Sequence, residues 1–224
     1  VSNTTYTMLK KSLIFTILGF LVVSCTLDTT EEYDALLYIE NGLPDLPQNN
    51  TEDNLESEVL QISHWINNMQ LPNGLLTSSE LTDNVSLYDN SLAALAFLAE
   101  GEIEQAERVF DYFNERIDSE FAQNNGGFYQ LRKSDGSNGA RTWLGDNAWL
   151  LIALNNYKEI TGNNKYDILA LELENWIRSL QDEDGGLWGG FNEDGTQIHK
   201  VTEGIIMAFN AVVGYDDFHK GILN

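Results

Sequence analysis

An internal repeat constrains the fold of this chain more than any other feature. Three short segments align with one another, and each carries an acidic residue at the same place: Asp89, Asp146 and Glu203, which are separated by two intervals of 57 residues. A fixed period is typical of folds in which one supersecondary unit stacks on the next. The sequence therefore predicts about three equivalent units, with one acid at the same point of each.

Two kinds of helical segment alternate within each unit. The first kind is amphipathic, with apolar residues three and four positions apart. Its segments are 55–69, 103–117 and 166–180. The second kind is apolar almost all round and must be buried on every side. Its segments are 92–98, 148–154 and 204–213. Outer amphipathic helices that alternate with buried inner helices predict an all-α fold, an α/α toroid of helical hairpins. Trp65 and Trp176 lie on outer stripes and are expected in the core.

The connections between these helices alternate in length with the same period as the repeat. The inner-to-outer connections, around 100–102 and around 161–163, are tight. The outer-to-inner connections are long and comprise 71–88, 119–145 and 182–202. Long loops in compact domains usually carry function, so one rim of the toroid is expected to hold the site.

The first 25 residues have the layout of a secretory signal. Lys10 and Lys11 follow Met8, and the apolar stretch 13–23 is too short to span a bilayer as a helix. The segment 21–25, LVVSC, resembles the lipobox of bacterial lipoproteins, in which the Cys is acylated and becomes the mature N-terminus.

This resemblance implies that Cys25 is a lipidation site and that a lipid anchors the protein in the cell envelope, at an outer membrane, facing the periplasm or the surface. Residues 1–24 are then upstream residues plus a signal peptide, 25–53 an acidic tether, and 54–224 a partial toroid domain. The alternative is that the stretch before Cys25 is a buried strand with an incidental cysteine.

Charge narrows the classes of partner. The chain has 12 Lys and Arg against 35 Asp and Glu, a net charge of −23. A chain this acidic repels phosphate backbones, so nucleic-acid binding is not expected. The three histidines are scattered without a zinc-ligand spacing, and neither a metal nor a cofactor is expected.

The segment 143–154, WLGDNAWLLIAL, together with Tyr157, 161–162 and the run GGLWGG at 185–190, resembles the six-hairpin glycosidase superfamily. The resemblance covers 54–224. It implies a carbohydrate bound at one rim between carboxylates and aromatics, and a glycoside hydrolase acting on a poly- or oligosaccharide. A closed toroid of that family has about six hairpins, whereas three are present here, which predicts a partial chain. The rival interpretation is a complete three-hairpin solenoid.

A second resemblance competes with the first. The segment 176–181, WIRSLQ, followed by Gly185, Gly186 and Trp188, is similar to the Gln-Trp repeat of terpenoid cyclases, which are also toroidal. The acidic motifs of those enzymes, Asp-x-Asp-Asp and Asp-Asp-x-x-Asp, are missing from the sequence. The mannan-cleaving glycosidases raise a different difficulty, because some carry paired Asp where this chain has Gly145-Asp146.

Candidate catalytic residues follow from the repeat. Glycoside hydrolysis needs one protonated carboxyl and one base or nucleophile. Asp146, Glu203 and Asp89 are the candidates, because all three are expected near starts of inner helices at the long-loop rim. The alternative role is helix capping, which Asp89 in particular suits.

Aromatic and basic residues on the long loops are candidates for substrate binding. The aromatic candidates are Trp143, Trp188, Tyr129, Phe128 and Phe191, which either stack on sugar faces or fix the loops to the toroid. The basic residues Arg132, Lys133 and Arg141 either contact an acidic sugar or form ion pairs.

Two other functions stay open beside the hydrolase. One is a non-catalytic, glycan-binding envelope lipoprotein. The other is a polysaccharide lyase with Tyr129 or His199 as the base.

Overall fold

The computed structural model describes residues 52–223 except Asn124. The chain divides into two compact units, 1–65 and 66–224, and the second unit contains the hairpins. The expectations for the signal peptide, Cys25 and nearly all of the tether lie outside the described residues.

The described part is dominated by helices. They are α3 (Glu52–Met69), α4 (Leu87–Glu100), α5 (Ile103–Asn114), α6 (Leu144–Thr161), α7 (Asp167–Ser179), α8 (Thr202–Ala211) and α9 (Asp217–Leu223), with a short 3₁₀ turn at Phe121–Gln123. Four short strands lie between them: β1 (Asn84–Ser86), β2 (Leu131–Lys133), β3 (Thr142–Trp143) and β4 (Gly190–Phe191).

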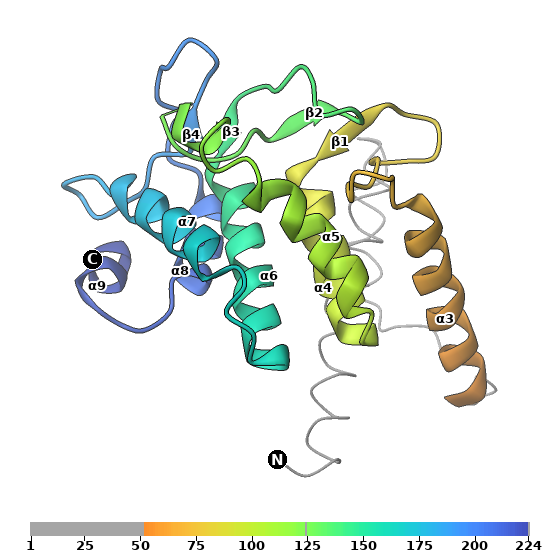
Figure 1. Ribbon diagram of the computed structural model, residues 1–224. Helices are drawn as coiled ribbons and strands as arrows, with labels where there is room; N and C mark the ends of the chain where they lie inside the picture. The colour runs from red at the N-terminus through yellow and green to blue at the C-terminus, as the bar shows by residue number, and fades with distance from the viewer. Residues whose placement is uncertain (1–51, 124, 224) are drawn as a thin grey trace, which may run out of the picture. The chain divides into compact units, whose positions relative to one another are not determined.

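The described helices form part of an α/α toroid, the fold class that the repeat predicts. In the second unit α6 packs between α4 and α8, and these three are the inner helices (Figure 1). The amphipathic helices α5 and α7 pack on α4 and α6. The side chain of Trp176 on α7 is buried as expected, but Trp65 on α3 is 48% exposed, so the prediction for Trp65 is wrong.

Two of the three inner helices are buried as their apolar composition predicts. Almost every side chain in the first three turns of α4 and α6 is buried. The prediction that the third inner helix is buried on every side is wrong, because only Gly204, Ala208 and Ala211 of α8 are buried and Ile206 is 49% exposed. Among the described residues, α6 covers α8 from one side only, since no further inner helix follows it.

The turns explain why the two rims differ. The helices α4 and α6 end at Gly101 and Gly162, which take the left-handed conformation (φ 82° and 67°) that glycine adopts without strain. At the other rim the long loops pair with each other in two short antiparallel ladders, β1 with β2 and β3 with β4. All four strands gather at the end of the molecule where the inner helices begin (Figure 1).

A repeated asparagine fixes two of the three long loops to their inner helices, and Gly204 takes its place in the third unit. Asn90 on α4 accepts a hydrogen bond from the backbone N of Leu76 (2.8 Å) and donates to the carbonyl of the same residue (3.0 Å). Asn147 on α6 does the same to Phe128, at 2.8 and 3.0 Å. Because buried backbone groups must be paired, each asparagine satisfies the backbone N and carbonyl of one loop residue and so holds that loop in place.

Candidate active site

The structure places the three repeat acids in the first turns of the inner helices. Asp89 lies in α4, Asp146 in α6 and Glu203 in α8, all at the rim that carries the strands. None of them is the N-cap of its helix. The cap positions belong to Ser86, Trp143 and Val201, and Ser86 is the one whose hydroxyl accepts from the backbone N of Asp89 (3.3 Å). The N-cap role considered for Asp89 is therefore wrong, although Asp89 lies in the first turn of α4, where a carboxylate complements the helix dipole.

Small residues bring α6 and α8 close together at this point. A Cβ added to Gly204 would lie 3.4 Å from the backbone N of Gly145. A Cβ added to Gly145 would lie 2.6 Å from Oε2 of Glu203. The Glu203 carboxyl therefore rests over the glycine that precedes Asp146, in space that any larger residue would occupy.

Asp146 is the most perturbed acid of the group. The residue is only 6% exposed, and its Oδ2 is buried without a hydrogen-bond partner. Burial raises the pKa of Asp146 from 3.8 to about 7, and the negative charge of Glu203 adds to the rise. A backbone hydrogen bond from Tyr88 and the side chain of Gln130 act in the opposite direction. Asp146 is therefore a carboxyl that is still about half protonated near neutral pH.

The other two acids are in more polar surroundings. Burial raises the pKa of Asp89, and a hydrogen bond with Ser78 opposes this. Burial also raises the pKa of Glu203, and a hydrogen bond with Trp143 opposes it. Glu203 as a whole is exposed, so the desolvation concerns the carboxyl end that rests on Gly145 and not the entire side chain. The site thus combines one buried carboxyl, that of Asp146, with the two more solvent-accessible carboxyls of Asp89 and Glu203.

Tyr88 is a further member of the group. Burial and the charges of Asp89, Glu203 and Asp146, in that order, raise the pKa of its hydroxyl. Its ring meets the edge of Trp149 with centroids 6.0 Å apart. Sequence reasoning missed Tyr88 and Gln130. Tyr88 could have been found as the aromatic residue beside Asp89 at the start of α4, whereas no sequence signal points to Gln130.

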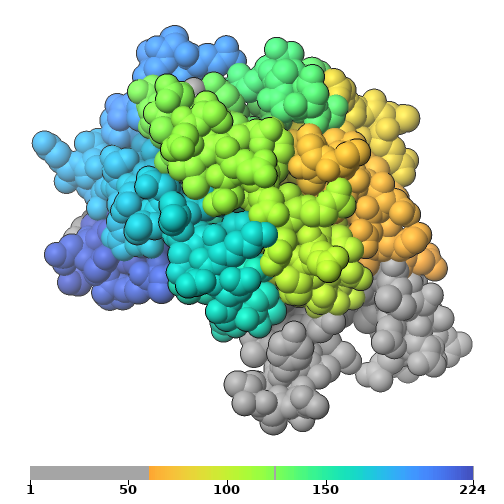
Figure 2. All heavy atoms as spheres, in the orientation of Figure 1, coloured from red at the N-terminus to blue at the C-terminus, as the bar shows by residue number. Residues whose placement is uncertain are grey.

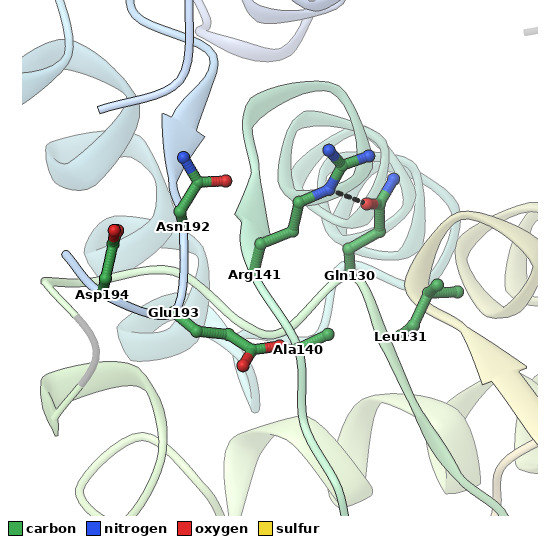
Figure 3. A pocket seen from close by; sticks show the side chains of 7 residues that line it. All are labelled: Gln130, Leu131, Ala140, Arg141, Asn192, Glu193 and Asp194. Carbon is green, nitrogen blue, oxygen red and sulfur yellow. Dashed lines mark hydrogen bonds between the residues drawn. The ribbon is translucent and has the colours of Figure 1, made fainter. Parts of the chain in front are cut away.

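A cavity of about 480 Å³ lies among the long loops, and none of the three acids lines it. It is lined by Gln130, Leu131, Ala140, Arg141, Asn192, Glu193 and Asp194 (Figure 3). The segments that form it lie side by side on the surface at the rim (Figure 2). A neighbouring cavity of about 480 Å³ shares part of this wall and adds Tyr129 and Phe191. Gln130 both lines the first cavity and interacts with Asp146, so it connects the open space to the buried acid.

The predicted aromatic residues separate into three groups. Trp143, Tyr129 and Phe191 are half-buried at the rim, at the acids or the cavity. Trp188 is half-buried in another loop, where the ammonium of Lys200 lies 5.1 Å from its ring centroid. Phe128 is fully buried and packs on Phe113 and Phe121, so the prediction that it binds substrate is wrong.

The three basic residues of the middle loop, 119–145, have different surroundings. Arg132 is buried in a two-pronged ion pair with Glu120, at 2.6 and 2.8 Å, so it does not contact a sugar. The same carboxylate accepts from the backbone N of Tyr129 (2.9 Å) and so ties the loop together. Lys133 donates to Asn84 across the ladder of β1 and β2 (2.9 Å). Arg141 is exposed at the cavity and is the loop cation that remains for a ligand.

The described residues contain no group of three or more His, Cys, Asp or Glu side chains placed to hold a metal ion. His199, considered as a lyase base, is exposed, and no described contact joins it to the three acids.

Within the described part of the chain, every helix is too short or too polar to cross a membrane.

Comparisons with known proteins agree with the fold. No protein-family model matches the chain, and no curated protein matches it. Among solved structures, it is similar to a cellobiose 2-epimerase from Spirochaeta thermophila DSM 6192, with a TM-score of 0.52 and 16% identity over 68% of this chain and 44% of that one. It is also similar to a family 105 glycoside hydrolase from C. acetobutylicum ATCC 824, with a TM-score of 0.55 and 12% identity over 71% of this chain and 51% of that one.

This chain thus spans about half the length of each of these proteins. At these identities the likeness concerns the fold, and it places the chain among α/α toroids of helical hairpins.

Proposed function

We propose that this chain is part of a carbohydrate-active enzyme that hydrolyses glycosidic bonds, with Asp146 as the general acid. The observation that carries the proposal is the buried, unpartnered oxygen of Asp146 beside a second carboxyl on the next inner helix. A general acid must hold its proton at the working pH, and the raised pKa of Asp146 meets that requirement. The two structural neighbours named above act on carbohydrates and have this fold.

Glu203 is the proposed base or nucleophile. Its side chain is exposed enough to meet a water or a sugar carbon, and the indole of Trp143 donates to it and so favours the charged form. Asp89, on the other side of Asp146, is the alternative partner. Two carboxyls with environments that separate their pKa values are the arrangement that glycoside hydrolysis uses.

The test is release of reducing ends from a panel of oligosaccharides by the full protein and by variants. Asp146→Asn is expected to lower the rate by about 10³-fold or more, because removal of a positioned acid typically costs about 10²–10⁴-fold. Glu203→Gln should have an effect of similar size. Asp135→Asn, which removes a carboxyl on an exposed turn, is the matched control and should keep full activity. An active Asp146→Asn variant would overturn the assignment.

The same oligosaccharide panel separates the two alternatives when binding and ultraviolet absorbance are measured beside the reducing ends. Binding of an oligosaccharide without any release of reducing ends would favour a glycan-binding protein. A product that absorbs in the ultraviolet would show an unsaturated sugar and hence a lyase.

We also propose that the protein works at the cell envelope, held by a lipid on Cys25. The support is the lipobox-like segment 21–25 and the apolar stretch before it. Mass spectrometry of the mature N-terminal peptide tests this, since acylated Cys25 should be the first residue. A mature chain that begins elsewhere would contradict it.

A further inference from the structure

We propose that Arg141 is a positioning residue of this site. It orients two side chains, Gln130 and Trp143, each of which contacts one of the candidate catalytic carboxyls. The role in turnover depends on the function proposed above, whereas the orienting role is a property of the site itself and is tested separately.

The backbone places Arg141 and Gln130 opposite each other. The backbone N of Gln130 donates to the carbonyl of Arg141 (2.8 Å), and Tyr129 and Thr142 form the next bridge of the same antiparallel pairing. Directly opposed residues on such a pair have side chains within contact distance. The Nε of Arg141 donates to Oε1 of Gln130 at 2.7 Å, as the dashed line in Figure 3 shows.

This hydrogen bond determines which end of the amide faces the acid. A guanidinium has only donors, so the oxygen of Gln130 must be the end that turns toward Arg141. The amide nitrogen, which has only donors, is then the end left for Asp146. The interaction of Gln130 with Asp146 stabilises the charged carboxylate, as a donor should.

The same guanidinium contacts the second acid through an aromatic ring. The Cζ of Arg141 lies 4.7 Å from the ring centroid of Trp143, a cation–π distance. The indole N–H is a donor only, and it interacts with Glu203. Trp143 is fixed on its other side by the pairing of β3 with β4, where it lies opposite Gly190.

The charges that face Asp146 come from two neighbouring helices. Tyr88 and Asp89 face it from α4, and Glu203 faces it from α8. The charges of Glu203 and Asp89 disfavour its ionisation, and two donors oppose them, the backbone N of Tyr88 on α4 and the side chain of Gln130 on the loop. Arg141 holds Gln130 through its hydrogen bond to the amide oxygen, and it also lines the cavity.

A double-mutant cycle on the ionisation of Asp146 tests the proposal. Its pKa is measured by ¹³C NMR of the carboxyl carbons in the full chain, with the signal assigned by its loss in Asp146→Asn. Gln130→Ala removes the donor and is expected to raise this pKa by about 0.5–1, the size of one hydrogen bond. Arg141→Met should raise it by a similar amount, and the double variant should show no further rise.

Two outcomes would overturn the proposal. One is an unchanged pKa of Asp146 in Arg141→Met. The other is a double variant whose rise is the sum of the single ones, because Arg141 would then act by its charge and not through Gln130. Lys133→Met is the matched control, since it removes a cation from the same loop that contacts Asn84 and not Gln130. It should leave the pKa of Asp146 unchanged, and an equal rise would also count against the proposal.

This experiment reads a protonation equilibrium and needs no substrate. If the chain proves inactive on every sugar, the cycle still decides whether Arg141 positions Gln130. If the cycle fails, the assignment of Asp146 as the acid still stands on its own kinetics.

Discussion

Replacing Asp146 with Asn should make the protein more stable at alkaline pH. The carboxyl has a pKa of about 7 in the folded chain against 3.8 for an exposed Asp. Between these values the folded state holds a proton that the unfolded state has lost, so stability falls as the pH rises. Asn is close in shape to the protonated acid and never has to be charged in this buried place.

The size of the effect follows from the two pKa values. Their difference of about 3, at about 1.4 kcal/mol each, gives about 4 kcal/mol once the pH is well above 7. Near pH 5.5 the wild type has lost about 2 kcal/mol of that stability, and below pH 3.8 the two proteins should be equal.

Urea unfolding of both proteins from pH 3.5 to 8.5 measures this difference directly. Asp135→Asn serves as a control of opposite sign, because side-chain and backbone hydrogen bonds from Ser137 lower the pKa of Asp135. Its stabilising contribution is present above the unfolded pKa and lost as the pH falls through the folded one, so this variant should be slightly weaker at neutral pH. If Asp146→Asn is no more stable than the wild type at pH 8.5, Asp146 is not a desolvated acid.

Three further substitutions test other parts of the structure. Gly145→Ala should lower any hydrolytic rate at least about 10-fold with little change in melting temperature, because the new methyl displaces the movable end of Glu203; normal activity would contradict the placement of that carboxyl. Glu120→Ala should cost about 3–5 kcal/mol in denaturant unfolding, because it leaves Arg132 buried and unpaired, and a loss below 1 kcal/mol would mean that the loop rearranges. Asn147→Ala should cost at least about 2 kcal/mol, since the buried backbone N and carbonyl of Phe128 lose their partner; an unchanged unfolding midpoint would show that water replaces the asparagine.

The sequence predicts the fold well because the repeat reports on burial. Helices that are apolar all round, such as 148–154, can only be inner helices, and amphipathic ones can only be outer. The exposure of Ile206 shows the limit of this reasoning, because composition says what a helix needs and not what packs on it. The strands escaped prediction since each has two or three residues, too few for an alternating pattern.

The sequence predicts which acids come together in the candidate site, but it does not predict the residues that contact them. Equal spacing in a repeat requires equivalent positions in space, so the approach of Asp146 and Glu203 follows from the sequence alone. The contact of Gln130 with Asp146 depends on how one long loop folds, and no periodicity encodes it. Phe128 failed as a binding residue for a related reason, since its loop turns inward where Asn147 holds it.

The adjacent residues Asp146 and Asn147 separate two tasks that many proteins assign to one side chain. The asparagine holds the loop, and the acid one position earlier is the residue that we propose for catalysis. The pair Asp89 and Asn90 repeats this division on the neighbouring hairpin. A scaffold of this kind can exchange the acid at 89 or 146 for another residue and keep the asparagine that holds the loop. Positions 89 and 146 are therefore suited to engineering a new activity on an unchanged frame.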